Sequence, residues 1–217
     1  MSILDNTTAL REVLDQANAL PDAGSGGGGG SEKLRQLVDG SVTEITAEDL
    51  GSINKIKQYA FCNCTELTRV ELPNTITEIG NNAFQACTRL EELNLPDGLM
   101  SIGTAALSAT AIKEIVFPVG ITTLPISLCN GANTLKIVCL GDITSIGAYA
   151  LAGSYLGSSC LEFDFTHCTS VPTLQNINAF NYINSAAKIK VPSALYDEWI
   201  ETTNWSDSTI ASKIVAS

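Results

Sequence analysis

Apolar and polar positions recur in a fixed order along residues 42–192, at intervals of 21 to 23 residues through most of this stretch. The clearest unit is ITEIGNNAFQACTRLEELNLPDG, from Ile76 to Gly98. A period of about 20 to 50 residues is typical of a solenoid, in which each coil buries its apolar face against its neighbours. We therefore expect one large apolar side chain per coil to stack on the next as an internal spine, formed by Phe61, Phe84, Leu107, Leu128, Leu151 and Phe180.

Each unit also contains a short run that alternates apolar and polar residues, which is typical of a β-strand. Four runs fit the L-x-x-L-x-L pattern of leucine-rich repeats, namely Leu67–Leu72, Leu90–Leu95, Ile112–Phe117 and Leu135–Leu140. Pro73, Pro96 and Pro118 follow the first three runs, and we take Gly141 as the equivalent position after the fourth. Because proline cannot donate a hydrogen bond to a sheet, these positions should mark strand ends.

These units resemble the BspA-type leucine-rich repeat, which has the approximate form V-T-x-I-G-x-x-A-F-x-x-C-x-x-L-x-x-I-x-I-P. The segments that carry the resemblance are VTEI, ITEIGNNAFQACTRLEELNLP, LMSIGTAALSATAIKEIVFP and ITSIGAYAL, within residues 42–192. The resemblance implies a strand-rich right-handed solenoid, and the spacing predicts five to six coils. The pattern is interrupted at GSYLGSSCLEFDF, where the sequence carries an insertion.

The first 22 residues are expected to form a separate helix ahead of the repeats. Residues 3–20 carry an a/d heptad seam, and residues 23–31 are a Gly-rich flexible linker to the solenoid of residues 32–192. Since a helix this short is marginally stable alone, we predict that it self-associates, as a trimer rather than a dimer, anchors to another protein, or docks on its own solenoid. The predicted oligomerisation residues are Ile3, Asn6, Leu10, Val13, Ala17 and Leu20.

The segment 193–217 is expected to be a short helical cap on the last coil. Its apolar positions predict two short helices that are separated at Asn204–Ser206. Trp199 and Trp205 should cover the end of the solenoid, which a repeat protein requires for solubility. The alternative is that the two tryptophans form a platform for a ligand.

The residue types that catalysis and metal binding require are scarce. His167 is the single histidine, no cysteine pair has zinc-site spacing, and no nucleophile or phosphate-loop motif occurs. We therefore predict a protein that is not an enzyme and has no catalytic residue, metal or cofactor. The seven cysteines are expected to be reduced and buried, although a disulfide between Cys64 and Cys87 on adjacent coils is geometrically conceivable.

Charge and hydropathy exclude further classes of partner. The net charge of −11 argues against nucleic-acid binding, because an acidic chain repels phosphate groups. No apolar run has the roughly 18 to 20 residues of a membrane span, so membrane insertion is not expected. The N-terminus lacks the basic and apolar regions of a secretory signal, so we do not expect export by that route.

The outward positions of the strands are the candidate binding surface, because strand side chains alternate between two sides. Counting back two and four residues from the proline, or from its equivalent, gives mostly charged residues. Val116, Ile137 and Cys139 break this pattern and predict an apolar centre on two neighbouring coils. We expect this centre to bind a partner, or else to be covered by the insertion Gly153–Cys160 or a neighbouring subunit. Its expected acidic neighbours are Glu92, Glu114, Glu162 and Asp164.

Two functions are compatible with these features. The ends of the chain, ILDNTTALREVLDQANALPDAGSGGGGG and VPSALYDEWIETTNWS, resemble those of bacteriophage tail or fibre-associated proteins. This resemblance implies a virion structural protein, assembled in the host cytoplasm, that joins other virion proteins through its N-terminal helix and binds a protein or host-surface receptor. The alternative, implied by the BspA resemblance, is an adhesin or protein-interaction module on a bacterial cell surface. A cytoplasmic scaffold is a third interpretation.

Overall fold

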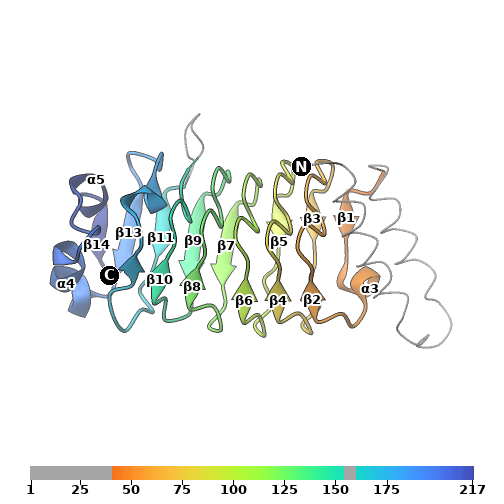
Figure 1. Ribbon diagram of the computed structural model, residues 1–217, viewed down its shortest axis with the longest axis horizontal. Helices are drawn as coiled ribbons and strands as arrows, with labels where there is room; N and C mark the ends of the chain where they lie inside the picture. The colour runs from red at the N-terminus through yellow and green to blue at the C-terminus, as the bar shows by residue number, and fades with distance from the viewer. Residues whose placement is uncertain (1–40, 154–159) are drawn as a thin grey trace.

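The computed structural model describes residues 41–153 and 160–217, which form an elongated solenoid (Figure 1). In this part of the chain six coils each contribute one strand to face A and one to face B. Face A consists of β1 (Glu44–Ile45), β3 (Arg69–Val70), β5 (Glu92–Leu93), β7 (Glu114–Phe117), β9 (Lys136–Cys139) and β11 (Glu162–Asp164), followed by β13 (Lys188–Val191). Face B consists of β2 (Lys55–Ile56), β4 (Glu78–Ile79), β6 (Ser101–Ile102), β8 (Thr123–Leu124), β10 (Ser145–Ile146) and β12 (Thr173–Leu174).

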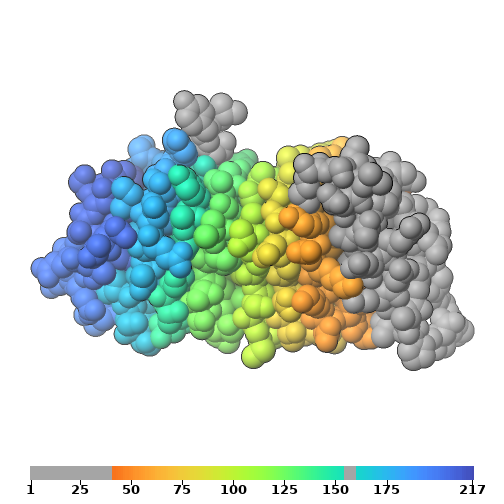
Figure 2. All heavy atoms as spheres, viewed as in Figure 1, coloured from red at the N-terminus to blue at the C-terminus, as the bar shows by residue number. Residues whose placement is uncertain are grey.

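The paired strands in the described residues are parallel, and equivalent strands of neighbouring coils pair everywhere except between the third and fourth coils. Their inward side chains are buried, as for Val70, Ile79 and Ile115, and they join one hydrophobic core that runs through all the coils. Figure 2 shows the coils as successive bands, each in contact with the next. The predicted solenoid of five to six coils is confirmed, whereas its right hand stays a prediction.

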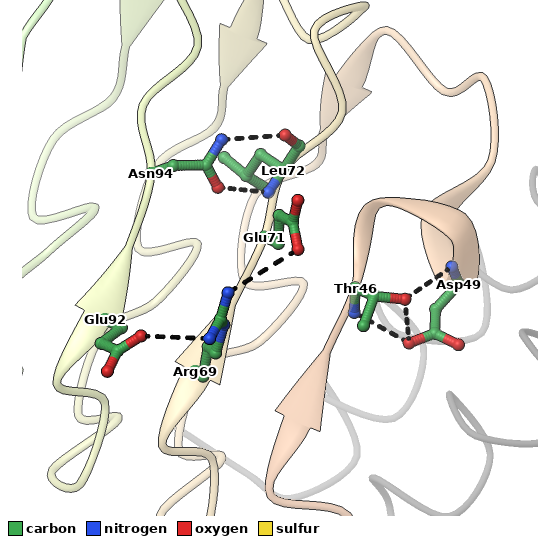
Figure 3. Close-up of polar contacts among 7 residues, drawn as sticks. All are labelled: Thr46, Asp49, Arg69, Glu71, Leu72, Glu92 and Asn94. Atoms are coloured by element: carbon green, nitrogen blue, oxygen red, sulfur yellow. Dashed lines mark hydrogen bonds and ion pairs between the residues drawn. The ribbon is translucent and has the colours of Figure 1, made fainter.

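The first coil contains the short helix α3 (Ala47–Leu50) between its two strands. Thr46 caps this helix, because its hydroxyl accepts a hydrogen bond from the Asp49 N–H while the Asp49 carboxylate accepts one from the Thr46 N–H (Figure 3). This reciprocal pair satisfies two backbone donors that the start of a helix leaves free. The helix buries Leu50 and so covers one part of the first coil.

The predicted spine of stacked apolar side chains is present, but in one coil a different residue contributes to it. The rings of Phe61 and Phe84 are stacked, with centroids 5.1 Å apart and planes at 1°. Backbone hydrogen bonds then set the register, since the Phe84 N–H donates to the Ala106 carbonyl and the Leu107 N–H to the Leu128 carbonyl. The spine residue of each coil is the one directly after the acceptor. Leu107, directly after Ala106, is therefore the spine residue of the third coil, and Cys129, directly after Leu128, is that of the fourth.

The prediction of Leu128 as a spine residue is therefore wrong. Leu128 is buried, but it takes the position that alanine holds in the other coils, and the smaller Cys129 takes the position of the phenylalanine. In the fourth coil the larger residue therefore comes first and the smaller second, the reverse of the order in the other coils. The interval from Leu107 to Cys129 is 22 residues, one less than the 23 residues between the earlier spine positions.

Gly103 lies where two coils approach closely, and we expect Gly103→Ala to lower the free energy of unfolding by about 1 to 3 kcal/mol. A Cβ at this position would stand 2.4 Å from the backbone nitrogen of Asn81 and 2.6 Å from the backbone of Gly80. Neither coil can move away without losing hydrogen bonds to its neighbour. Urea unfolding followed by tryptophan fluorescence measures the change.

Gly98→Ala is the matched control for that substitution. Its added Cβ would meet the nearest atom, the Asn74 carbonyl oxygen, at 3.5 Å, which is an ordinary contact. We expect a change below about 0.5 kcal/mol for this exchange, as for other surface substitutions. Equal losses for the two variants would contradict the close approach of the coils at Gly103.

The C-terminal cap contains the two predicted helices and an additional strand. The 3-10 helices η1 (Ile177–Phe180) and η2 (Ser193–Leu195) precede α4 (Tyr196–Glu201) and α5 (Ser208–Ala211), and the chain ends with β14 (Ile214–Ala216), which pairs with β13. Trp199 and Trp205 are fully buried, and their rings pack with centroids 5.3 Å apart. Both indoles therefore belong to the core of the cap, and the alternative of a ligand platform is excluded.

Some predictions fall outside the described residues. These are the heptad helix with its proposed oligomerisation residues, the Gly-rich linker, and the part of the insertion between residues 154 and 159. Self-association through residues 3–20 and the boundaries of the first two segments stay predictions.

Candidate functional site

Face A presents two outward rows of side chains, in register across the coils. The first row contains Glu44, Arg69, Glu92, Glu114, Lys136, Glu162 and Lys188, and the second contains Glu71, Asn94, Val116, Val138, Asp164 and Lys190. The hydrogen bond from the Lys113 N–H to the Glu91 carbonyl, at 3.3 Å, carries this register from β5 to β7. Glu92 and Glu114 are therefore neighbours in the first row.

Ion pairs join the first row between adjacent strands. Arg69 lies 3.5 Å from Glu92, Lys136 lies 3.1 Å from Glu114, and Lys190 of the second row lies 2.8 Å from Glu162. The hydrogen bond to Glu114 raises the pKa of Lys136. These side chains are solvated, so each pair stabilises the fold by less than about 1 kcal/mol. Their main effect is to fix a charge pattern on the surface of face A.

The predicted apolar centre is only partly correct. Val116 is 39 % exposed on face A, whereas Ile137 and Cys139 are 2 % and 0 % exposed and point into the core. The strand register pairs Val116 with Val138 and Phe117 with Cys139. The residue that replaces the proline after β9 is therefore Leu140 and not Gly141. A shift of one residue moves every side chain of a strand to the other side of the sheet, which explains the error.

The remaining predicted partner-binding residues lie on face A. Glu92 and Glu114 are exposed, and Glu162 and Asp164 are half-buried in the two outward rows. Val138, which the prediction missed, is the half-buried outward neighbour of Val116. The signal that would have found Val138 is the alternation of Lys136–Cys139 itself, counted without reference to a following proline.

The pairing of strands is interrupted on both faces between the third and fourth coils. β5 is the last strand of one sheet and β7 is the first of the next, and on face B the same holds for β6 and β8. We call this interruption the seam. On face B Pro125 occupies the position of Gly103 and Gly147, whose N–H groups donate to the preceding coil at 2.8 Å, and proline has no such donor.

On face A the seam exposes side chains that are buried elsewhere. Leu93 and Leu95 are half-buried, whereas the equivalent Val70 and Leu72 are 1 % and 2 % exposed. No hydrogen bond joins the backbone of Asn94 to β7 in the part of the chain that the structure describes. β5 thus has a free edge beyond Glu92.

The side chain of Asn94 replaces a backbone link on the other side of β5. Its Oδ1 accepts a hydrogen bond from the Leu72 N–H at 2.6 Å, and its Nδ2 donates to the Leu72 carbonyl at 2.9 Å (Figure 3). In the last coils the N–H at the Leu72 position, that of Phe165, donates to the backbone carbonyl of Lys190 instead. The amide of Asn94 therefore holds β5 to β3 where the ladder of backbone hydrogen bonds ends.

Asn94→Asp is expected to lower the free energy of unfolding by about 1 to 2 kcal/mol. The carboxylate keeps an acceptor for the Leu72 N–H but loses the donor to the Leu72 carbonyl, and it places a negative charge beside that oxygen. Urea unfolding at neutral pH measures the loss, and Asn74→Asp, in an exposed turn, is the control. An equal effect of both substitutions would show that the side-chain bridge does not stabilise β5.

A depression of about 630 Å³ lies on face A over β3, β5 and the start of β7. Arg69, Glu71, Glu92 and Glu114 carry its charges, together with Glu91 and Lys113, and Leu93 and Asn94 form part of its wall. Figure 3 shows Arg69 between Glu71 and Glu92 at this place. The site is therefore an open, mostly acidic surface with an apolar wall.

The described residues lack the side-chain clusters that bind metal ions. No group of three metal-ligating side chains occurs among them, and none of their helices has the length and hydropathy to cross a membrane. The seven cysteines are free and buried, as predicted, and burial raises the pKa of Cys64 to about 12. The Cys87 thiol donates to the Phe61 carbonyl at 2.9 Å. These cysteines are core residues.

The comparison with protein families identifies the repeats. The family described as BspA type leucine rich repeat region (6 copies) matches residues 38–158. The match covers more than half of the 217 residues, and the chain belongs to this family. Leucine-rich repeats of this kind are non-enzymatic modules that bind other proteins through their extended surfaces.

Two solved structures are similar to the chain. One is the T. pallidum leucine rich repeat protein, with 22 % identity and a TM-score of 0.40 over 65 % of this chain and 54 % of that one. The other is a leucine-rich repeat protein from Bacteroides ovatus, with 19 % identity and a TM-score of 0.28 over 64 % of this chain and 59 % of that one. The chain thus spans less than two thirds of either protein. No curated protein sequence matches it significantly.

Proposed function

We propose that the protein is a protein-interaction module that binds its partner on face A. The observation that carries this proposal is the depression over β3, β5 and β7, where the half-buried Leu93 adjoins charged side chains. Interfaces of transient complexes combine an apolar centre with a polar rim in this way. Val116 extends the apolar part along the second row.

Face B offers a different surface. Its outward strand positions include Ser101, Thr123 and Thr173, which are small and polar. Several threonine hydroxyls next to these strands are used within the fold, since Thr77 donates to the Asn54 carbonyl and Thr144 to the Thr122 carbonyl. The outward strand positions of face B therefore provide little apolar area for a partner, and the exposed apolar residues Met100 and Ile126 lie beside its strands.

The setting we favour is a bacterial surface, as an adhesin or interaction module. Its support is that the chain belongs to the BspA type leucine-rich repeat family. The virion role that the chain ends suggest has no support in the comparisons, and its proposed anchor, residues 3–20, lies outside the described residues.

Selection from a random peptide-display library tests the proposal and does not require that the natural partner be identified first. The wild-type protein is the bait, and enriched peptides are then measured against two double variants. The first, Val116→Lys with Val138→Glu, alters paired outward positions on face A. The second, Ser101→Lys with Thr123→Glu, makes the same exchange on adjacent coils of face B.

We expect the face A variant to weaken binding of the enriched peptides at least tenfold and the face B variant to leave it within twofold. Each double variant introduces one cation and one anion on outward strand positions, of which only Val138 is half-buried, so net charge and folding should be unchanged. Circular dichroism melting checks the fold of both. Peptides that lose binding only to the face B variant would contradict the proposal.

A further inference from the structure

We infer that the seam on face A binds an extended segment of a protein partner in which lysine or arginine residues flank a branched apolar residue. This inference rests on the proposed function and specifies the chemistry of the partner. It is carried by three observations on the same few residues: a pair of like charges, a half-buried apolar wall and a free strand edge.

The charge pattern of the first row changes at the seam. From β1 to β5 the row alternates as Glu44, Arg69 and Glu92, and from β7 to β11 it alternates again as Glu114, Lys136 and Glu162. Where the two series meet, Glu92 and Glu114 are neighbours. Like charges at facing positions of a sheet are destabilising, so this pair is unfavourable in the free protein.

The cations that contact this pair lie on its outer sides, and Lys113, which lies at the seam, pairs with Glu91 at 3.9 Å. The Arg69 guanidinium on β3 lies 3.5 Å from the Glu92 carboxylate, and the Lys136 ammonium on β9 lies 3.1 Å from the Glu114 carboxylate. The depression between them has four glutamates and two basic residues, Arg69 and Lys113. A positive group placed between Glu92 and Glu114 would relieve their repulsion, which makes the site complementary to lysine or arginine.

The wall of the depression adds a requirement for an apolar side chain. Leu93 is half-buried in the depression, and Val116, the neighbour of Asn94 in the second outward row, is 39 % exposed on β7. Two more exposed apolar residues continue around the edge of the same coils, because the turn at Gly120 lies against the backbone of Leu99 and Met100. These are Met100, 72 % exposed, and Val119, 67 % exposed.

The strand edges favour a ligand with an extended backbone. β5 and β7 end their sheets at the seam, and no backbone hydrogen bond joins Asn94 to β7 among the described residues, so a ligand that lies across face A can reach backbone groups there. The Lys113–Glu91 hydrogen bond closes the start of the seam, so the ligand must lie over its open part, beyond Glu92. An extended peptide places alternate side chains on the surface, with the apolar one toward Leu93 and the basic ones toward the glutamates.

The test uses the full-length protein and a fluorescein-labelled peptide of sequence Gly-Lys-Val-Arg-Val-Lys-Gly. Its charge-reversed counterpart, Gly-Glu-Val-Glu-Val-Glu-Gly, is the control ligand. Fluorescence anisotropy at low ionic strength gives both affinities. We expect at least a tenfold preference for the basic peptide, and a loss of this preference at high salt, because exposed charges are screened.

The protein variant Glu92→Gln with Glu114→Gln removes the acidic pair without a change of shape. We expect it to bind the basic peptide about five- to tenfold more weakly, and to be at least as stable to urea as the wild type. The matched control, Glu44→Gln with Glu198→Gln, removes the same charge at exposed positions on β1 and α4. It should reduce the affinity by less than twofold.

The inference is overturned if the two peptides bind equally, or if the two double variants weaken binding to the same extent. Its failure is distinct from failure of the proposed function. Library peptides that depend on Val116 and Val138 but carry no basic residues would retain face A as the interaction surface and reject the seam as a basic-peptide site.

Discussion

Raising the pH from 8 to about 10.5 is expected to unfold the protein in the absence of denaturant. The cause is the set of buried thiols in the core. Burial raises the pKa of Cys64 and of Cys160 to about 12, from an ordinary value of 9.0, and raises those of Cys87 and Cys139 well above that value. These thiols stay protonated in the folded state at a pH where the unfolded chain has lost their protons.

The sign of the effect follows from this difference. Each raised pKa contributes stability that is fully present below pH 9 and is lost as the pH rises toward the folded-state value. One such thiol costs about 1.4 kcal/mol per pH unit above 9. Four of them together remove about 6 kcal/mol by pH 10, which is comparable to the whole stability of a typical domain.

Urea unfolding at a series of pH values, with a reducing agent present, measures this slope. Cys64→Ala with Cys87→Ala removes two of the thiols and should lower the slope between pH 9 and 10 by about 3 kcal/mol per pH unit. Ile56→Val, a buried exchange that removes no thiol, should reduce stability without a change of slope. A free energy of unfolding that is constant from pH 8 to 10.5 would contradict the burial of the cysteines.

Replacement of Trp205 by alanine is expected to destabilise the C-terminal cap by about 3 to 5 kcal/mol. The indole is fully buried, its ring centroid lies 5.5 Å from that of Phe180, and its Nε1 donates to the Pro172 carbonyl at 2.8 Å. The substitution leaves a large cavity and an unsatisfied carbonyl oxygen. Because a solenoid is stabilised by contacts between neighbouring coils, loss of the cap should also open the last coil.

Thermal unfolding and amide hydrogen exchange measure these two effects. We expect faster exchange in β12 and β13 of the Trp205→Ala variant, while β2 and β4 at the other end keep the exchange rates of the wild type. Trp205→Phe, which keeps a ring but removes the donor, should lose about 1 to 3 kcal/mol. A loss below 1 kcal/mol for Trp205→Ala would mean that the indole does not support the cap.

The sequence predicted the coils because each one repeats the same residue types at the same positions. The spacing of Phe61, Phe84 and Leu107 is enough to place the spine, and the alternation before Pro73 and Pro118 is enough to place strands. The cap was predictable for a similar reason. Trp199 and Trp205 are the largest apolar residues after the last repeat, and the end of a solenoid must be covered.

The register of the fourth and fifth coils was not predictable from these signals. The fourth coil carries Leu128 and Cys129 where the others have alanine followed by a large residue, and β9 is followed by Leu140 instead of proline. In each case two neighbouring residues fit the repeat equally well: Leu128 or Cys129 as the spine residue, and Leu140 or Gly141 as the equivalent of the proline. The backbone hydrogen bonds between coils decide between them, and a single sequence does not contain that information.

The sequence did not predict the seam, because no motif marks the place where two neighbouring strands fail to pair. Its two signals in the sequence are Pro125, at a position where glycine is usual, and the change of interval from 23 to 22 residues after Leu107. Neither indicates by itself that both sheets are interrupted. The strand β14 was missed because its three residues carry no periodic pattern and follow two helices instead of a repeat motif.

The central claim is that a partner binds on face A at the seam, and amide hydrogen exchange with a bound ligand tests it most directly. The protein is compared with and without a saturating peptide from the display selection. We predict protection in the segments 91–95 and 113–117, which border the seam on face A, and unchanged exchange in β6 and β8, which border it on face B. Protection confined to β6 and β8, or to the C-terminal cap, would contradict the claim.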